Sequence, residues 1–267
     1  MFEIFSYDFM LRALVAGLIL SVVAPTIGIF FVVRRSSAIS DTLAHVSFAG
    51  VAAALLFNFS GMLGALIACV LATLGMERIR DQRTLPMDTV VTLFLFGGLA
   101  LGVVLLGLAS GGASVSSYLF GSILTVSSSS LWQMAVIGFV VLVVAAIFFK
   151  QLFAISLDEE TAEASGLPVK RLNRILALLG AATIAISINV VGVLLIGALM
   201  VVPVISAMQF KKGFADTLFI AIVISVLSVI SGLLVSFYAN LASGATIVLC
   251  TIVIFFISII GVRIFQR

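Results

Sequence analysis

The chain has 267 residues, of which 63% are hydrophobic and only 9% are charged, and its mean hydropathy is +1.38. Soluble domains carry about 25% charged residues, so this composition excludes a soluble globular protein and indicates an integral membrane protein. Apolar runs of roughly 20 residues recur along the chain, a length that predicts transmembrane helices rather than a barrel. The net charge of +3 is split among short basic clusters, so it does not indicate nucleic-acid binding.

The basic residues predict the topology. They cluster at 34–35, 78–83, 150, 170–174, 211–212 and 263–267, and only Arg12 stands apart. If every cluster is cytoplasmic, each interval between clusters holds an even number of crossings. We therefore expect a first helix at about 9–33 and helix pairs in 36–77, 84–149, 175–210 and 213–262. This makes about nine spans, with eight as the alternative because 175–210 is short for two helices. The nine-span arrangement places Met1 outside and Arg267 inside.

Turn residues separate the paired helices. We expect turns at 58–61, near Asn189 and at 240–244, and a polar outer segment at about 110–130, where the serine run 127–130 begins a helix. Asp88 follows Pro86 and is expected to cap the helix that begins there. Cys69 and Cys250 stand alone in apolar runs and are expected to be buried hydrophobic residues. The amino terminus lacks a basic segment, so no cleaved signal peptide is expected, and residues 1–267 are expected to form one transmembrane domain.

The chain lacks the common signatures of enzymes. It contains no G-x-x-x-x-G-K-[ST] phosphate loop, no G-x-S-x-G elbow and no H-E-x-x-H pair, and His45 is the only histidine. A histidine metal cluster or a Ser-His-Asp triad therefore has almost no residues from which to form. We expect a protein that is not an enzyme and that cannot hydrolyse ATP by itself.

A cytoplasmic loop within 156–168 predicts a short acidic helix. Ser156 and Glu159 have the spacing of a capping box, and Asp158, Glu159 and Glu160 fill the first turn, where negative charge suits the helix dipole. Gly166 is a natural end residue, and the following proline prevents continuation, so a helix of about eight or nine residues is expected. Two interpretations stay open at this point: a solvated linker helix, or a docking element for a cytoplasmic partner.

Asp41 and His45 lie four residues apart, which places them on one face of a helix, one turn from each other. If this helix starts just after Arg35, Asp41 lies about 8–9 Å and His45 about 15 Å along it. Ionisable groups at that depth in a membrane usually face a pathway or a partner. Two structural alternatives are open: Asp41 caps a helix that starts late, and His45 hydrogen-bonds a neighbouring backbone carbonyl.

Pro203, together with Gly192 and Gly197, predicts a bend in the seventh helix near the path. Proline removes one backbone hydrogen bond, and its ring disturbs the preceding turn. The alternative is a static kink that serves only for packing.

The whole chain resembles the permeases of ABC importers for zinc and manganese, and most closely the zinc-importer permeases. The resemblance rests on SYDFMLRAL, GIFFVVRRSSAISDTLAHVSFAGVA, SYLFGSIL, SLDEETAEASGLPV and VVGVLLIGALMVVPVISA. D-T-L-A-H-x-S and G-x-L-L-x-x-A-L-x-V-x-P-x-x-x-A are its specific patterns. Manganese-type relatives tend to have H-x-x-L-P-G where this chain has His45-Val-Ser-Phe-Ala-Gly50, a departure that favours zinc.

This resemblance implies a bacterial plasma-membrane permease that works as a homodimer in lipid. It also implies two ATPase chains, which bind ATP and magnesium, and an extracytoplasmic metal-binding lipoprotein that delivers the ion. Asp41 and His45 would line the central path. The loop with Asp158, Glu159, Glu160, Ala162 and Gly166 would couple to the ATPase, although Thr161 replaces an alanine of the family's E-A-A-x-x-x-G pattern and the downstream I-x-L-P is missing.

A two-fold axis between the two chains of such a dimer would bring together two copies of Asp41 and His45. Two Asp41 oxygens and two His45 nitrogens would form a set that can hold Zn²⁺ tetrahedrally but transiently. Zinc is thus the expected cargo and no permanently bound cofactor is expected, with manganese or iron as the alternative. A secondary transporter or channel and, more remotely, a membrane enzyme are the rival classes.

Overall fold

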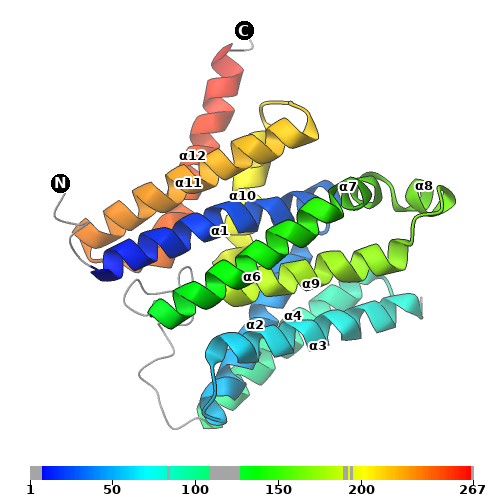
Figure 1. The fold of residues 1–267 in the computed structure, drawn as a ribbon, viewed down its shortest axis with the longest axis horizontal. Helices are drawn as coiled ribbons and strands as arrows, with labels where there is room; N and C mark the ends of the chain where they lie inside the picture. Colours follow the sequence, from blue (N-terminus) through cyan, green and yellow to red (C-terminus); the bar gives the residue numbers. More distant parts are fainter. Residues whose placement is uncertain (1–7, 83–84, 109–126, 189–191, 193–194, 266–267) are drawn as a thin grey trace.

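A computed structural model of the chain describes residues 8–82, 85–108, 127–188, 192 and 195–265. Within these ranges the protein is built from helices and contains no strand (Figure 1). In chain order the helices are α1 (Asp8–Val33), α2 (Ala38–Leu56), α3 (Gly61–Asp81), α4 (Met87–Leu108), α6 (Ser128–Ile147), α7 (Phe149–Leu157), α8 (Glu159–Ala164), α9 (Val169–Ser187), α10 (Ile196–Met208), α11 (Phe214–Ala239) and α12 (Ser243–Phe265).

Each of the nine expected spans coincides with one of these helices. Seven of them, α1, α2, α3, α4, α6, α11 and α12, are long and apolar enough to cross a membrane. The other two are α9 and α10. The start of α9 carries the basic residues Lys170, Arg171 and Arg174, and α10 has only 13 residues. They occupy the interval 175–210, the shortest one predicted for a helix pair, although α9 begins before it at Val169. Whether both helices cross the membrane stays a prediction.

The turns lie where the sequence places them. Asn58 and Asn240 adopt left-handed backbone conformations, with φ of 57° and 52°, and Asn240 is the C-cap of α11. Ser127 caps α6 by accepting a hydrogen bond from the Ser130 N–H, and Asp88 lies in the first turn of α4. The expected turn at Asn189 and most of the polar outer segment lie outside the described residues.

Close helix contacts in the bundle depend on glycine. A Cβ atom on Gly50 of α2 would lie 2.7 Å from the carbonyl carbon of Gly64 in α3. A Cβ atom on Gly28 of α1 would lie 2.8 Å from the carbonyl carbon of Met200 in α10. Larger residues would force these backbones apart, so the small residues let α2 pack on α3 and α1 on α10.

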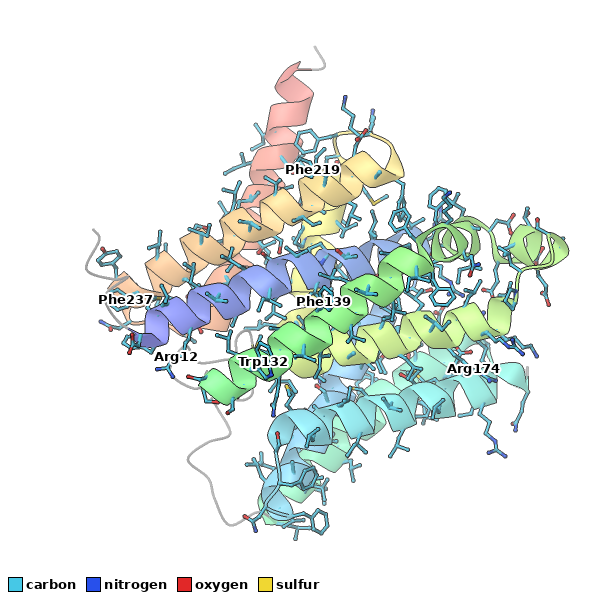
Figure 2. All side chains as sticks on the ribbon, in the orientation of Figure 1. Arg12, Trp132, Phe139, Arg174, Phe219 and Phe237 are labelled. Atoms are coloured by element: carbon cyan, nitrogen blue, oxygen red, sulfur yellow. The ribbon has the colours of Figure 1, made fainter. Side chains whose placement is uncertain are left out.

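The outer surface carries large apolar side chains. Trp132 and Phe139 of α6 and Phe219 of α11, labelled in Figure 2, are 72%, 69% and 68% exposed. Figure 2 also shows Arg12 and Arg174 at opposite ends of the bundle. This arrangement agrees with the expected topology, in which Arg12 alone is on the outer side.

Candidate functional site

The helix that carries Asp41 and His45 begins later than expected. Arg35 has a φ of +56°, and α2 starts at Ala38 with Ser37 as its N-cap. At 1.5 Å per residue, Asp41 lies about 4.5 Å and His45 about 10.5 Å along the helix, rather than 8–9 Å and 15 Å. The pair therefore lies nearer the helix start than predicted.

The late start does not make Asp41 a cap. Asp41 is the fourth residue inside α2, whereas a cap precedes the helix and accepts bonds from its second or third residue. The alternative for His45, a hydrogen bond to a neighbouring backbone carbonyl, is not seen at one of its two ring nitrogens. Nδ1 of His45 is buried and has no hydrogen-bond partner among the described residues. Capping therefore does not explain Asp41, although its place in the first turn suits the helix dipole, and no hydrogen bond among the described residues explains Nδ1 of His45.

A glycine of another helix lies against the Asp41 carboxylate. A Cβ atom on Gly197 of α10 would lie 3.2 Å from Cγ of Asp41 and 3.7 Å from its Cα, and closer still to Oδ1. The other side of Asp41 is open, because the residue is exposed in the single chain, and His45 is half-buried. The pair is thus supported by α10 on one side and accessible on another.

Two side-chain hydrogen bonds fix α2 at the level of the pair. Oγ1 of Thr42 donates to the carbonyl of Val91 in α4 at 3.2 Å, and Sγ of Cys69 in α3 donates to the carbonyl of Leu43 at 3.2 Å. Cys69 is fully buried, as predicted, although its thiol also makes this bond. Because Thr42 and Leu43 lie between Asp41 and His45 in sequence, the pair rests on a braced part of α2.

One chain supplies too few donors for a complete metal site. In the described ranges no group of three or more His, Cys, Asp and Glu side chains could hold an ion. Asp41 and His45 offer one carboxylate and one imidazole, whereas a structural or catalytic zinc takes three or four protein ligands. A second copy of the chain would supply the missing two.

The loop predicted to couple to an ATPase is helical, but its cap differs from the prediction. Ser156 lies inside α7, where its buried hydroxyl donates to the Leu152 carbonyl at 2.7 Å, so it forms no capping box with Glu159. Asp158 is the N-cap instead, and its Oδ1 accepts from the N–H groups of Glu160 and Thr161 at 3.0 and 3.1 Å. The capping-box prediction was therefore wrong by two residues.

Hydrogen bonds set the ionisation of this cap. The Thr161 hydroxyl donates to Oδ2 of Asp158 at 2.7 Å. This bond, with those from the N–H groups of Thr161 and Glu160, holds the pKa of Asp158 below its ordinary value, against a small opposing effect of burial. The cap carboxylate is therefore charged at neutral pH.

The end of α8 follows the prediction. Gly166 has a φ of +84°, its N–H donates to the Glu163 carbonyl at 2.9 Å, and the N–H of Leu167 donates to the Ala162 carbonyl at 3.2 Å. These two bonds form a Schellman motif, which requires the left-handed conformation that glycine adopts easily. The helix has six residues rather than eight or nine, Ala162 is buried against the bundle, and Glu160 is exposed.

The structure places Glu159 differently from its acidic neighbours. Its carboxylate turns towards the bundle and accepts hydrogen bonds from Arg34, Arg80 and Asn173. Sequence reasoning used Arg34 and Arg80 only as topology markers and did not single out Asn173. No local signal pairs these residues, because Arg34 and Arg80 lie 125 and 79 positions away from Glu159.

The predicted bending residues do not share one helix. Gly192 precedes α10, has a φ of +83° and donates its N–H to the Ile188 carbonyl at 3.2 Å, so it forms part of the connection after α9. Gly197 and the buried Pro203 lie within α10. Gly192 thus lies before α10 rather than within it, and the bending role of Gly192, Gly197 and Pro203 stays a prediction.

These features define a class: a multi-pass, all-helical membrane protein whose ionisable pair lies on a braced inner helix. Residues 6–262 match the ABC 3 transport family. The manganese transport system membrane protein MntC of Listeria monocytogenes is 31% identical over 94% of this chain and 90% of its own length. The high-affinity zinc uptake system membrane protein ZnuB of Haemophilus influenzae is 28% identical over 95% of this chain and 97% of its own.

A solved structure shares the fold. The structure of PsaBC from Streptococcus pneumoniae in complex with Fab superposes with a TM-score of 0.84 at 28% identity, over 96% of this chain and 92% of that one. The chain therefore belongs to the ABC 3 transport family, and it is a multi-pass permease of the bacterial membrane rather than an enzyme. SYLFGSIL, one of the stretches that carried the resemblance, lies outside the described residues.

Proposed function

We propose that the chain is the permease of an ATP-driven zinc importer, in which two copies form the metal path between them. The observation that carries the proposal is the Asp41–His45 pair, stacked one turn apart on α2 and open on one side. In a two-fold dimer such a pair supplies two oxygens and two nitrogens, which suits tetrahedral Zn²⁺. The carboxylates also offset the charge of a divalent ion in a low-dielectric surrounding.

Zinc is preferred over manganese on the chemistry of the donors. Imidazole nitrogen suits zinc, whereas manganese prefers sites dominated by oxygen. The residues after the histidine, His45-Val-Ser-Phe-Ala-Gly50, also differ from the H-x-x-L-P-G that manganese-type relatives tend to have. Manganese is the second candidate, because relatives named for manganese and for zinc are similarly close to this chain.

The remaining parts of the importer lie on other chains. We infer that two ATPase subunits bind ATP and magnesium and dock at α8, where Glu160 is exposed, as is Gly166 just after the helix. An extracytoplasmic metal-binding protein delivers the ion to the opposite side. The permease itself holds the cargo only briefly, because a transport site must release its ion.

Uptake into proteoliposomes tests the proposal. The permease is reconstituted with the ATPase and the binding protein, and accumulation of radioactive Zn²⁺ and Mn²⁺ is measured with ATP, without ATP and in competition. We expect ATP-dependent zinc uptake that excess manganese inhibits weakly. Uptake without the ATPase would indicate a secondary transporter or channel, and preferential manganese uptake would make manganese the cargo.

A further inference from the structure

One carboxylate joins the start of α8 to three other parts of the bundle. Oε2 of Glu159 accepts a hydrogen bond of 2.7 Å from Nη2 of Arg34. Its Oε1 accepts one from Nη2 of Arg80 and one of 2.9 Å from Nδ2 of Asn173. Arg34 directly follows α1, Arg80 lies in the last turn of α3, and Asn173 lies in α9. Glu159 is thus the meeting point of four chain segments.

Further contacts close the cluster around this carboxylate. Nη1 of Arg34 donates to Oδ1 of Asn173 at 2.8 Å, and Nη1 of Arg80 lies 3.5 Å from Oε1 of Glu77. The Arg34 side chain is only 16% exposed and that of Glu159 is 34% exposed. Hydrogen bonds between charged groups are stronger than neutral ones, and shielding from water strengthens them further.

The cluster keeps Glu159 charged. Burial alone would raise the pKa of its carboxyl group, but the Asn173 hydrogen bond and the two guanidinium groups outweigh that effect and lower it. At physiological pH the charged Glu159 therefore keeps its contacts with Arg34, Arg80 and Asn173, which together form the tie between α8 and the bundle.

Arg34 connects this hydrogen-bonded cluster to α2, the helix that carries Asp41 and His45. Only residues 34–37 separate α1 from α2. The N–H of Arg35 donates to the Val32 carbonyl at 3.0 Å, and that of Ser36 to the Phe31 carbonyl at 2.9 Å, so the turn is a Schellman motif with Arg35 in the left-handed conformation. A displacement of Arg34 therefore passes through a short, hydrogen-bonded turn to the first turn of α2, which contains Asp41.

The bundle leaves space beside the cluster. A cavity of about 520 Å³ is lined by Arg34, Glu77, Arg80, Glu159 and Asn173, together with residues of α1, α2, α7 and α9. A shift of α8 relative to α1 and α3 can use this space without compressing packed side chains. The tie is therefore a link between elements that have room to move.

We propose that Glu159 is a positioning residue that transmits movement of α8 through Arg34 to α2, and so changes the setting of Asp41 and His45 during transport. The inference rests on the proposed function, because an ATPase docked at α8 supplies the movement. It reassigns Glu159 from the surface that meets the ATPase to the link behind that surface. Glu160 and Glu163 stay exposed on α8.

Glu159→Gln in the assembled transporter tests the link. The change keeps the shape of the side chain and removes the charge that holds both guanidinium groups. We expect ATPase binding and basal ATP hydrolysis to persist, while the number of Zn²⁺ ions imported per ATP falls by about five- to tenfold, the lower range of coupling between sites. Asp216→Asn is the control, because it removes one carboxylate from an exposed position in the first turn of α11, outside the helix at which the ATPase docks, and its ratio should equal the wild-type ratio.

A double-mutant cycle separates transmission from simple stability. If Arg34 and Glu159 act as a unit, Arg34→Gln and the double variant should each lower the ratio about as much as Glu159→Gln alone. A purely structural role would instead reduce assembly and the thermal midpoint while the assembled fraction kept a wild-type ratio, which would overturn the inference. The inference would also be overturned if Glu159→Gln imported as many Zn²⁺ ions per ATP as a wild type that shows ATP-dependent uptake. A wild type that neither binds an ATPase nor imports metal would remove the proposed function, and this inference with it.

Discussion

Gly197 of α10 lies so close to the carboxylate of Asp41 in α2 that a methyl group cannot be added without displacing one of them. Gly197→Ala should therefore shift the Asp41 side chain or α10. Overpacking of this kind costs about 1–3 kcal/mol of stability, and we expect it to reduce transport strongly because the shift falls on the site. Thermal unfolding in detergent and metal uptake measure the two effects.

Gly97 provides the control for this substitution. It lies in α4, and a Cβ atom there would meet nothing within 4 Å. Gly97→Ala should leave uptake unchanged and leave stability equal or slightly raised, since alanine favours a helix by about 1 kcal/mol over glycine. Equal effects at both positions would show that contact with Asp41 is not what matters at Gly197.

The Asp41–His45 pair predicts distinct results for three substitutions. His45→Ala removes the nitrogen donor and should abolish or greatly slow zinc uptake. Asp41→Asn removes the charge while keeping the shape of the side chain, so it separates electrostatic attraction from packing. His45→Asp leaves only oxygen donors and should shift preference from zinc towards harder ions such as manganese. Uptake is compared at equal amounts of assembled complex, and wild-type zinc rates in both Asp41→Asn and His45→Ala would make these residues structural.

The Asp158 cap predicts an acid-sensitive α8. A carboxyl group whose pKa is lowered by folding stabilises the folded state above its unfolded pKa of about 3.9, and this contribution disappears as pH falls through the lower folded value. Protection of the Glu160 and Thr161 amides from hydrogen exchange should thus decline only in strong acid. Asp158→Ala should lose this protection at neutral pH, whereas Asp158→Asn, which keeps an acceptor, should retain most of it.

The topology predicts opposite accessibility for two positions. In a chain with Cys69 and Cys250 replaced by serine, Ala113→Cys should react with an impermeant thiol reagent from outside, and Glu163→Cys only from inside. Position 113 lies outside the described residues, whereas Glu163 is an exposed residue of α8. Labelling of both from one face would contradict the nine-span arrangement.

Pro203 tests whether α10 bends during transport. It is buried inside the helix and donates no backbone hydrogen bond. Pro203→Ala restores a donor and should slow uptake if bending there accompanies the transport cycle. Unchanged uptake with unchanged assembly would show that Pro203 serves packing only.

Much of the architecture follows from local properties of the sequence. Continuous apolar runs predict the long helices because the membrane requires backbone groups to bond within each span. Asn58, Asn240 and Gly166 tolerate left-handed conformations, so they mark the turns and the end of α8 where the structure has them. The spacing of Asp41 and His45 likewise places them on one helix face without knowledge of any other residue.

Only the tertiary structure decided which distant residues meet these local elements. Glu159 has the same local setting as Glu160, yet its carboxylate turns to Arg34 and Arg80 because α1 and α3 end beside α8. In the same way the sequence singles out Gly197 only for helix bending, and its contact with Asp41 arises because α10 packs on α2. Helices form from contacts a few residues apart, whereas these contacts depend on how whole helices cross, which hydropathy and spacing do not encode.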